Sequence, residues 1–229
     1  MTAPARRPEA LIFDFDGLIL DTETCTYDAV VEIFAEHGEV LDEAWWRSIL
    51  GTADHPHWTE QLAAQLGRPV DRAALVARRE ARRLPVIEAL AACDGVTVLL
   101  DAADAAGVPA AVASSSASDW VVPHLERLRL WHRFQAVVTR DDVGGDSART
   151  KPAPDLFLAA AAALGADPAR CVVLEDSPNG VAAGRAAGMA VVAVPGPMTR
   201  TLDFGAADLV AASLADLDIA SLGAVLPTG

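Results

Sequence analysis

The stretch Ala10-Leu-Ile-Phe-Asp-Phe-Asp-Gly-Leu-Ile19 joins an apolar run to two aspartates and a glycine. The apolar run predicts a buried β-strand, and because side chains alternate along a strand, Asp14 and Asp16 point the same way. Gly17 allows the chain to turn sharply after them. Two carboxylates held this close repel each other unless a cation lies between them or one of them takes a proton. A strand that ends in this way indicates a site that holds Mg²⁺ and attacks phosphorus.

Apolar runs of similar length recur along the chain and alternate with helical patterns. Each run is nearly continuous in apolar character, as expected of a parallel strand covered on both faces. The further strands expected are Pro109–Ala113, Ala136–Thr139, Cys171–Leu174 and Ala190–Val194. The helices expected beside them are Thr97–Ala106, Asp119–Leu130, Pro154–Leu164 and Asn179–Ala187. This alternation predicts an α/β fold with a doubly wound parallel sheet, and the tail adds an edge strand at Ala207–Val210 and a short helix at Ser213–Leu217.

One interval lacks strands and reads as several amphipathic helices, from about residue 23 to residue 90. It is too long for an ordinary crossover between two strands. We therefore predict a catalytic core of residues 1–22 and 91–229 and a helical cap of residues 23–90. An insert at this point would lie over the carboxyl ends of the strands, where open α/β sheets bind ligands, and would act as a lid.

Three more polar segments end or follow predicted strands. They are Ser114-Ser115-Ser116, the segment Lys151-Pro-Ala-Pro-Asp155 and the pair Glu175-Asp176. Because the carboxyl ends of parallel strands share one edge of the sheet, we expect these segments to meet the two aspartates of the first strand there.

The four segments together resemble the four motifs of the haloacid dehalogenase-type phosphohydrolase superfamily. The helical insert after the first motif is similar to the small helical cap of that superfamily, in its β-phosphoglucomutase and phosphoglycolate phosphatase branch. The resemblance covers nearly the whole chain. It implies a Rossmann-like core and a Mg²⁺-dependent phosphatase that hydrolyses a small phosphorylated metabolite through an aspartyl-phosphate.

The carboxylates suit this chemistry. Asp14 is the natural nucleophile, since a carboxylate can form an aspartyl-phosphate, and the first aspartate has that role in the family. Asp16 would protonate the leaving alcohol and then take a proton from water. Mg²⁺ prefers oxygen ligands, which Asp14, the backbone carbonyl of Asp16 and Asp176 would supply. By resemblance, Glu175 orients a water bound to the metal.

Three residues are expected to bind the phosphoryl group. Ser114 offers its hydroxyl and Ser115 its backbone N–H to the phosphoryl oxygens. Lys151 places a positive charge between the nucleophile and the substrate phosphate, and so reduces the repulsion between two anions.

A sugar phosphomutase like β-phosphoglucomutase is the main alternative. The mutase has a histidine ten residues after the acid/base aspartate, where this chain has Thr26. It also has an arginine soon after the glycine of the cap's substrate loop, whereas the stretch here is Gly51-Thr-Ala-Asp54. Both differences favour hydrolysis. A phosphorylated signalling module and a binding protein without catalysis are more remote alternatives.

Several other polar and aromatic residues have structural interpretations. Ser116 or Ser118 is expected to cap the helix near Asp119, and Asn179 to begin the following helix. Three tryptophans are expected in the core of the cap: Trp45, Trp46 and Trp58.

The charged residues of the cap are also open to two interpretations. The clustered arginines Arg78-Arg79 and Arg82-Arg83 favour a solvated helix face over a surface that reaches toward an anionic substrate. His55 and His57 favour a solvated loop over a metal site.

The composition limits the remaining possibilities. A net charge of −14 argues against binding nucleic acid through its phosphates. No apolar run approaches the ~20 residues that span a bilayer. Three cysteines at irregular spacing do not suggest disulfides or a zinc site. We expect a cytoplasmic protein that is a monomer or weak homodimer.

Overall fold

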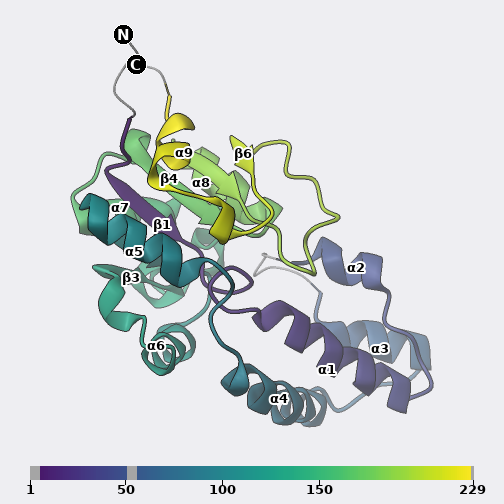
Figure 1. Cartoon of the computed structure of the whole chain (residues 1–229). Coiled ribbons are helices and arrows are strands. Elements are labelled where there is room, and N and C mark those ends of the chain that lie inside the picture. The colour runs from purple at the N-terminus through teal and green to yellow at the C-terminus, as the bar shows by residue number, and fades with distance from the viewer. Residues whose placement is uncertain (1–5, 51–55, 228–229) are drawn as a thin grey trace.

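The computed structural model describes residues 6–50 and 56–227. In this part of the chain a six-stranded parallel sheet runs in the order β3-β2-β1-β4-β5-β6, which confirms the predicted fold class (Figure 1). The strands are β1 (Ala10–Phe13), β2 (Ala110–Ala113), β3 (Ala136–Val138), β4 (Cys171–Glu175), β5 (Ala190–Ala193) and β6 (Leu209–Val210). The strand with the two aspartates therefore lies in the middle of the sheet, between β2 and β4.

Alternate side chains of β1 pack into the apolar clusters on opposite faces of the sheet. Leu11 and Phe13 belong to one apolar cluster, and Ala10 and Ile12 belong to another. Helices α5 (Val96–Ala106), α6 (Ser118–Arg127) and α9 (Ile219–Ala224) cover the first face, while α7 (Asp155–Leu164) and α8 (Pro178–Ala186) cover the second. Because both faces are buried, the strands are apolar except for Glu175 at the end of β4.

The interval between β1 and α5 folds as a helical insert below the sheet in Figure 1. Its helices are α1 (Thr22–Glu36), α2 (Glu43–Ser48), α3 (Trp58–Leu66) and α4 (Arg72–Ala89). The insert has its own apolar cluster, which contains Trp46 and Trp58, with Trp45 packed against it as predicted. Met198, from the loop after β5, also lies in this cluster. The boundaries at residues 22/23 and 90/91 stay a prediction.

The C-terminal segment differs from the prediction. The stretch expected to be the last helix forms only a short 3₁₀ turn, η5 (Leu214–Asp216), and the last α-helix is α9. The side chain of Asp218 accepts a hydrogen bond from the Ser221 backbone N–H, and the Ser221 hydroxyl accepts one from the Asp218 backbone N–H. This capping box was the sequence signal for the helix.

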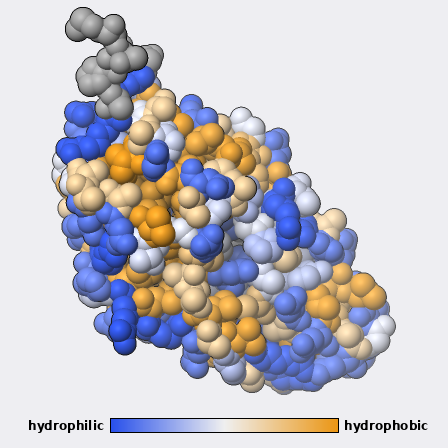
Figure 2. All heavy atoms as spheres, in the orientation of Figure 1, coloured by the Kyte–Doolittle hydropathy of each residue, from blue (hydrophilic) through white to orange (hydrophobic). Residues whose placement is uncertain are grey.

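The surface carries polar and apolar residues side by side. Figure 2 shows them intermixed over the sheet and the insert on one face of the molecule. Among the helices described, none combines the length and the apolar character that crossing a bilayer requires.

Candidate active site

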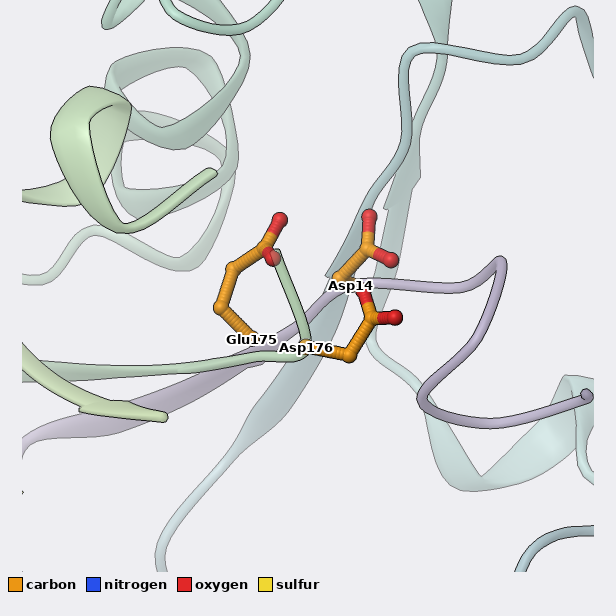
Figure 3. A group of neighbouring side chains, drawn as sticks. All are labelled: Asp14, Glu175 and Asp176. Atoms are coloured by element: carbon orange, nitrogen blue, oxygen red, sulfur yellow. The ribbon is translucent and has the colours of Figure 1, made fainter. Parts of the chain in front are cut away.

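Three buried carboxylates meet at the carboxyl ends of two neighbouring strands. Asp14 follows β1, Glu175 ends β4, and Asp176 follows it (Figure 3). One carboxylate oxygen from each lies within 4.8 Å of the others. The parallel register aligns Phe13 with Leu174 and so brings these residues side by side. The structure therefore brings together the first and fourth predicted segments.

Lys151 lies between two of these carboxylates. Its ammonium donates to Asp14 Oδ1 and, at 2.7 Å, to Glu175 Oε1. The other oxygen of Glu175 accepts from the Ser177 backbone N–H at 2.7 Å and from the Ser177 hydroxyl at 3.0 Å. Glu175 is thus fully engaged by protein donors, and its position is fixed.

The charges in this cluster are strongly coupled. Burial, and secondarily the charge of Glu175, raise the pKa of Asp14 to about 8 against the lowering effect of Lys151. Burial alone would lower the pKa of Lys151, but the attraction of Asp14 and Glu175 outweighs it and raises that pKa. The ammonium therefore stays charged and contacts two of the three carboxylates.

Asp176 has a carboxylate that faces the cavity without a partner. It is 4% exposed, and within the described ranges no protein group donates a hydrogen bond to it. Burial, followed by the charges of Glu175 and Asp14, raises the pKa of Asp176 well above its ordinary value. A buried carboxylate in this state is stabilised by a cation, and a hard divalent ion suits an all-oxygen donor set.

Gly17 shapes the same spot. Its φ of +87° is a left-handed conformation that favours glycine, and a Cβ atom there would overlap Asp176 Oδ2. The turn after Asp16 can therefore approach the fourth segment closely only because residue 17 has no side chain.

Asp16 lines the same cavity as this cluster and accepts three hydrogen bonds. Thr22 Oγ1 and Trp120 Nε1 donate to its Oδ1, each at 2.8 Å, and Ser116 Oγ donates to its Oδ2 at 2.6 Å. The serine was expected to cap α6, but the cap position is Ala117, and Ser118 instead donates to Asp141. Sequence reasoning identified Asp16 and missed all three donors.

The two serines of the second segment lie near Lys151. Ser114 is 1% exposed, and its hydroxyl accepts from the backbone N–H of Ser116 at 3.0 Å. The Ser115 hydroxyl accepts from the backbone N–H of Lys151 at 3.3 Å. Both residues line the same cavity as the carboxylates, so the second and third segments join the site.

This cavity has a volume of about 610 Å³, and the insert forms its other wall. Among the described residues, the helices and loops of the insert contribute these lining residues: Thr22, Glu23, Thr26, Leu50, Arg79 and Arg83. Burial and the nearby charge of Asp16 raise the pKa of the half-buried Glu23 to about 7, which the two arginines oppose.

The clustered arginines of α4 separate into two pairs, which corrects the expectation of a uniformly solvated face. Arg79 and Arg83 line the cavity and both bind Glu80. Arg78 and Arg82 pair with Glu36 on α1. The i,i+4 spacing predicted which arginines share a face, but not which face meets the cavity.

Two other expectations have different outcomes. The Asn179 side chain donates to the Leu50 backbone carbonyl at 3.0 Å and so ties α8 to the insert, a role that the sequence did not suggest. His57 caps α3 through its ring nitrogen. His55 and the stretch Gly51–Asp54 lie outside the described residues.

Comparisons with known proteins agree with this geometry. The family model of haloacid dehalogenase-like hydrolases matches residues 11–194. The protein named "Putative phosphatase YhcW" from Bacillus subtilis is 42% identical over 214 residues, which cover 93% of this chain and 96% of that protein.

Two solved structures are similar over nearly their whole length. A haloacid dehalogenase family hydrolase from Deinococcus radiodurans, with bound phosphate and sodium, has a TM-score of 0.76 and 30% identity, covering 98% of this chain and 100% of that one. CbbY from Rhodobacter sphaeroides, in complex with xylulose-(1,5)bisphosphate, has a TM-score of 0.70 and 28% identity, covering 94% and 99%. With this sheet, this insert and these matches, the chain belongs to the haloacid dehalogenase-like hydrolase family and is an enzyme of its phosphatase class.

Proposed function

We propose that this enzyme hydrolyses the phosphate monoester of a small, polar metabolite through an aspartyl-phosphate formed on Asp14. The observation that carries the proposal is the shared cluster of Asp14, Lys151, Glu175 and Asp176 on the floor of a cavity that the insert covers.

In the first step a carboxylate oxygen of Asp14 attacks phosphorus and the ester P–O bond breaks. The alkoxide that leaves takes a proton from Asp16, which lines the same cavity. Lys151 contacts Asp14 and stabilises the nucleophile in its ionised form. Ser114 and Ser115 bind phosphoryl oxygens through a hydroxyl and a backbone N–H.

In the second step Asp16, now ionised, takes a proton from water, whose oxygen attacks the phosphorus of the aspartyl-phosphate. The bond between phosphorus and the Asp14 oxygen breaks, and inorganic phosphate leaves. The same carboxyl group thus gives a proton in one step and takes one in the next, and the starting enzyme is restored.

The residues present fit a bound Mg²⁺. Asp14, the backbone carbonyl of Asp16 and Asp176 would hold it, and Glu175 would act from behind through water. Bound Mg²⁺ supplies positive charge that offsets the charge of the phosphoryl group and of the carboxylates. Among residues 6–50 and 56–227 no protein group donates a hydrogen bond to the buried Asp176, and this supports the assignment.

The insert is proposed to select the substrate and to close over it. Glu23, Thr26, Arg79 and Arg83 give its cavity wall a polar character that suits hydroxyl or charged groups on the leaving part. CbbY, which has a similar fold, was solved with a phosphorylated sugar, and this supports a compact polyhydroxylated substrate.

The proposal is tested with purified protein and a panel of phosphorylated metabolites, with phosphate release as the readout. We expect Mg²⁺-dependent turnover that Asp14→Asn abolishes and that Asp16→Asn reduces by roughly 10²–10⁴-fold. Asp155→Asn is a matched control, because that carboxylate pairs with Arg149 on the surface. Full activity of Asp14→Asn would reject the nucleophile.

The mutase alternative is tested in the same panel with glucose 1,6-bisphosphate present. Thr26 occupies the position of the mutase histidine, and its hydroxyl donates to the Thr22 carbonyl at 2.7 Å. It therefore offers no titratable group to the cavity. Conversion of β-glucose 1-phosphate to glucose 6-phosphate, in place of phosphate release, would favour the mutase.

A further inference from the structure

The indole of Trp120 connects the acid/base candidate to helix α6. Its Nε1 donates to Asp16 Oδ1 at 2.8 Å. The other donor to that oxygen, Thr22, stands at the start of α1, and the donor to Oδ2, Ser116, precedes α6. Both oxygens are therefore held, and Trp120 is the largest side chain that holds them.

The insert in turn holds Trp120. The guanidinium carbon of Arg83, on α4, lies 4.6 Å from the centre of the tryptophan ring. Arg83 is itself fixed by Glu80, at 2.9 Å, and by the Thr26 hydroxyl, at 3.3 Å. A cation over an indole face attracts it electrostatically, and more strongly when both are shielded from water. Arg83 is 15% exposed.

Trp120 also contacts a residue of its own helix. The half-buried ring of His124, one turn further along α6, meets the indole edge to face at 4.5 Å between centroids. The indole is thus contacted both by a ring from its own helix and by a cation from the insert. Both contacts restrict the rotation of the indole and with it the direction of its N–H.

We propose that Trp120 is a positioning residue for Asp16 and that Arg83 makes this positioning depend on the seating of the insert. The inference rests on the proposed function, since it assigns Asp16 the proton transfers. A carboxyl group that must reach the leaving oxygen within hydrogen-bond distance loses rate when it is free to rotate. With the insert lifted, Arg83 leaves the indole, and Asp16 loses a fixed donor.

The test compares two substrates that differ in their need for a proton. The p-nitrophenolate group leaves without protonation, whereas the alkoxide of an alkyl phosphate requires a proton. Since kcat/KM reports the steps up to release of the alcohol, Trp120→Phe should lower kcat/KM about tenfold more for the alkyl phosphate of the panel that is hydrolysed fastest than for p-nitrophenyl phosphate. Phenylalanine keeps an aromatic ring for Arg83 and removes the N–H, together with one ring of the indole.

Two further variants separate positioning from a structural effect. In an Asp16→Asn background, Trp120→Phe should not change the substrate ratio any further, because it acts through Asp16. Arg83→Leu should shift the ratio in the same direction as Trp120→Phe. It should have no such effect in the Asp16→Asn background, which separates positioning of Asp16 from a lost contact with the substrate and carries the test should the tryptophan variant not fold. Arg78→Leu, on the same helix but paired with Glu36, is the matched control and should leave the ratio unchanged.

Each outcome decides between the two proposals. An unchanged ratio in both Trp120→Phe and Arg83→Leu, with melting temperatures near that of the natural protein, would overturn this inference and leave the phosphatase assignment intact. Absence of turnover that depends on Asp14 in the natural protein would reject the proposed function itself.

Discussion

The replacement Lys151→Met tests whether one ammonium holds the carboxylate cluster together. Lys151 is 3% exposed and contacts both Asp14 and Glu175. Methionine has a similar length and no charge. The change therefore leaves three buried carboxylates without the ammonium that contacts two of them.

The expected loss follows from the burial of that pair. Removing one partner of a buried ion pair costs about 3–5 kcal/mol. For a chain of 229 residues each kcal/mol shifts the melting temperature by about 2–4 °C, so we expect a fall of about 10 °C. The fall should be largest in alkaline solution. Lys151 lowers the pKa of Asp14, so its removal raises this pKa further above the unfolded value. The variant therefore loses more stability than the natural protein as the pH rises toward and above the natural value of about 8.

The assay is calorimetric melting of the metal-free protein near pH 5.5 and near pH 8.5, on either side of that pKa. Arg149→Met is the control, because this neighbouring residue forms an exposed ion pair with Asp155, which contributes about 0–1 kcal/mol. A fall of less than about 3 °C, or the same fall at both pH values, would refute the reasoning.

Three other predictions follow from the site. Gly17→Ala should weaken Mg²⁺ binding by tenfold or more, measured by titration calorimetry, because the added methyl group would overlap Asp176. The control is Gly38→Ala: Gly38 also has a positive φ, but an added methyl group there would meet no atom within 4 Å, so this variant should bind Mg²⁺ normally. Mg²⁺ should raise the melting temperature more near pH 8.5 than near pH 5.5, because the raised pKa of Asp14, about 8, leaves this ligand protonated in acid; an equal rise would contradict metal binding there. The KM for an anionic substrate should rise above about pH 7 as Glu23 ionises, and Glu23→Gln should remove this rise, as measured by pH profiles at saturating Mg²⁺.

The sheet and the carboxylate cluster could be predicted because each depends on a local pattern. Apolar runs of four or five residues fix where strands lie, and the residue after each run falls at the shared edge whatever the helices do. The sequence marks Lys151 in a further way: among its 18 lysines and arginines, Lys151 is the only lysine. A compact ammonium fits between two carboxylates where the planar group of arginine does not.

The cavity wall could not be predicted in the same way. The spacing of the arginines on α4 groups Arg79 with Arg83, but the face they share is oriented by the packing of α1 on α4, which involves residues far apart in the chain. The role of Ser116 could not be predicted for the same reason. A serine before a helix is usually its N-cap, but in the folded chain the Ser116 hydroxyl lies beside Asp16 and donates to it instead.

Met198 links the segment after β5 to the apolar cluster of the insert. This residue belongs to the core by sequence, yet its side chain fills space among the apolar residues of the insert, and Arg47 of α2 donates to its carbonyl. The proposed opening of the insert for product release would require the segment that carries Met198 to move with it or to expose a buried thioether, at a cost of about 1.5–3 kcal/mol. We therefore expect Met198→Ala to loosen the contact between this segment and the insert and to speed the exchange of small molecules with the solvent.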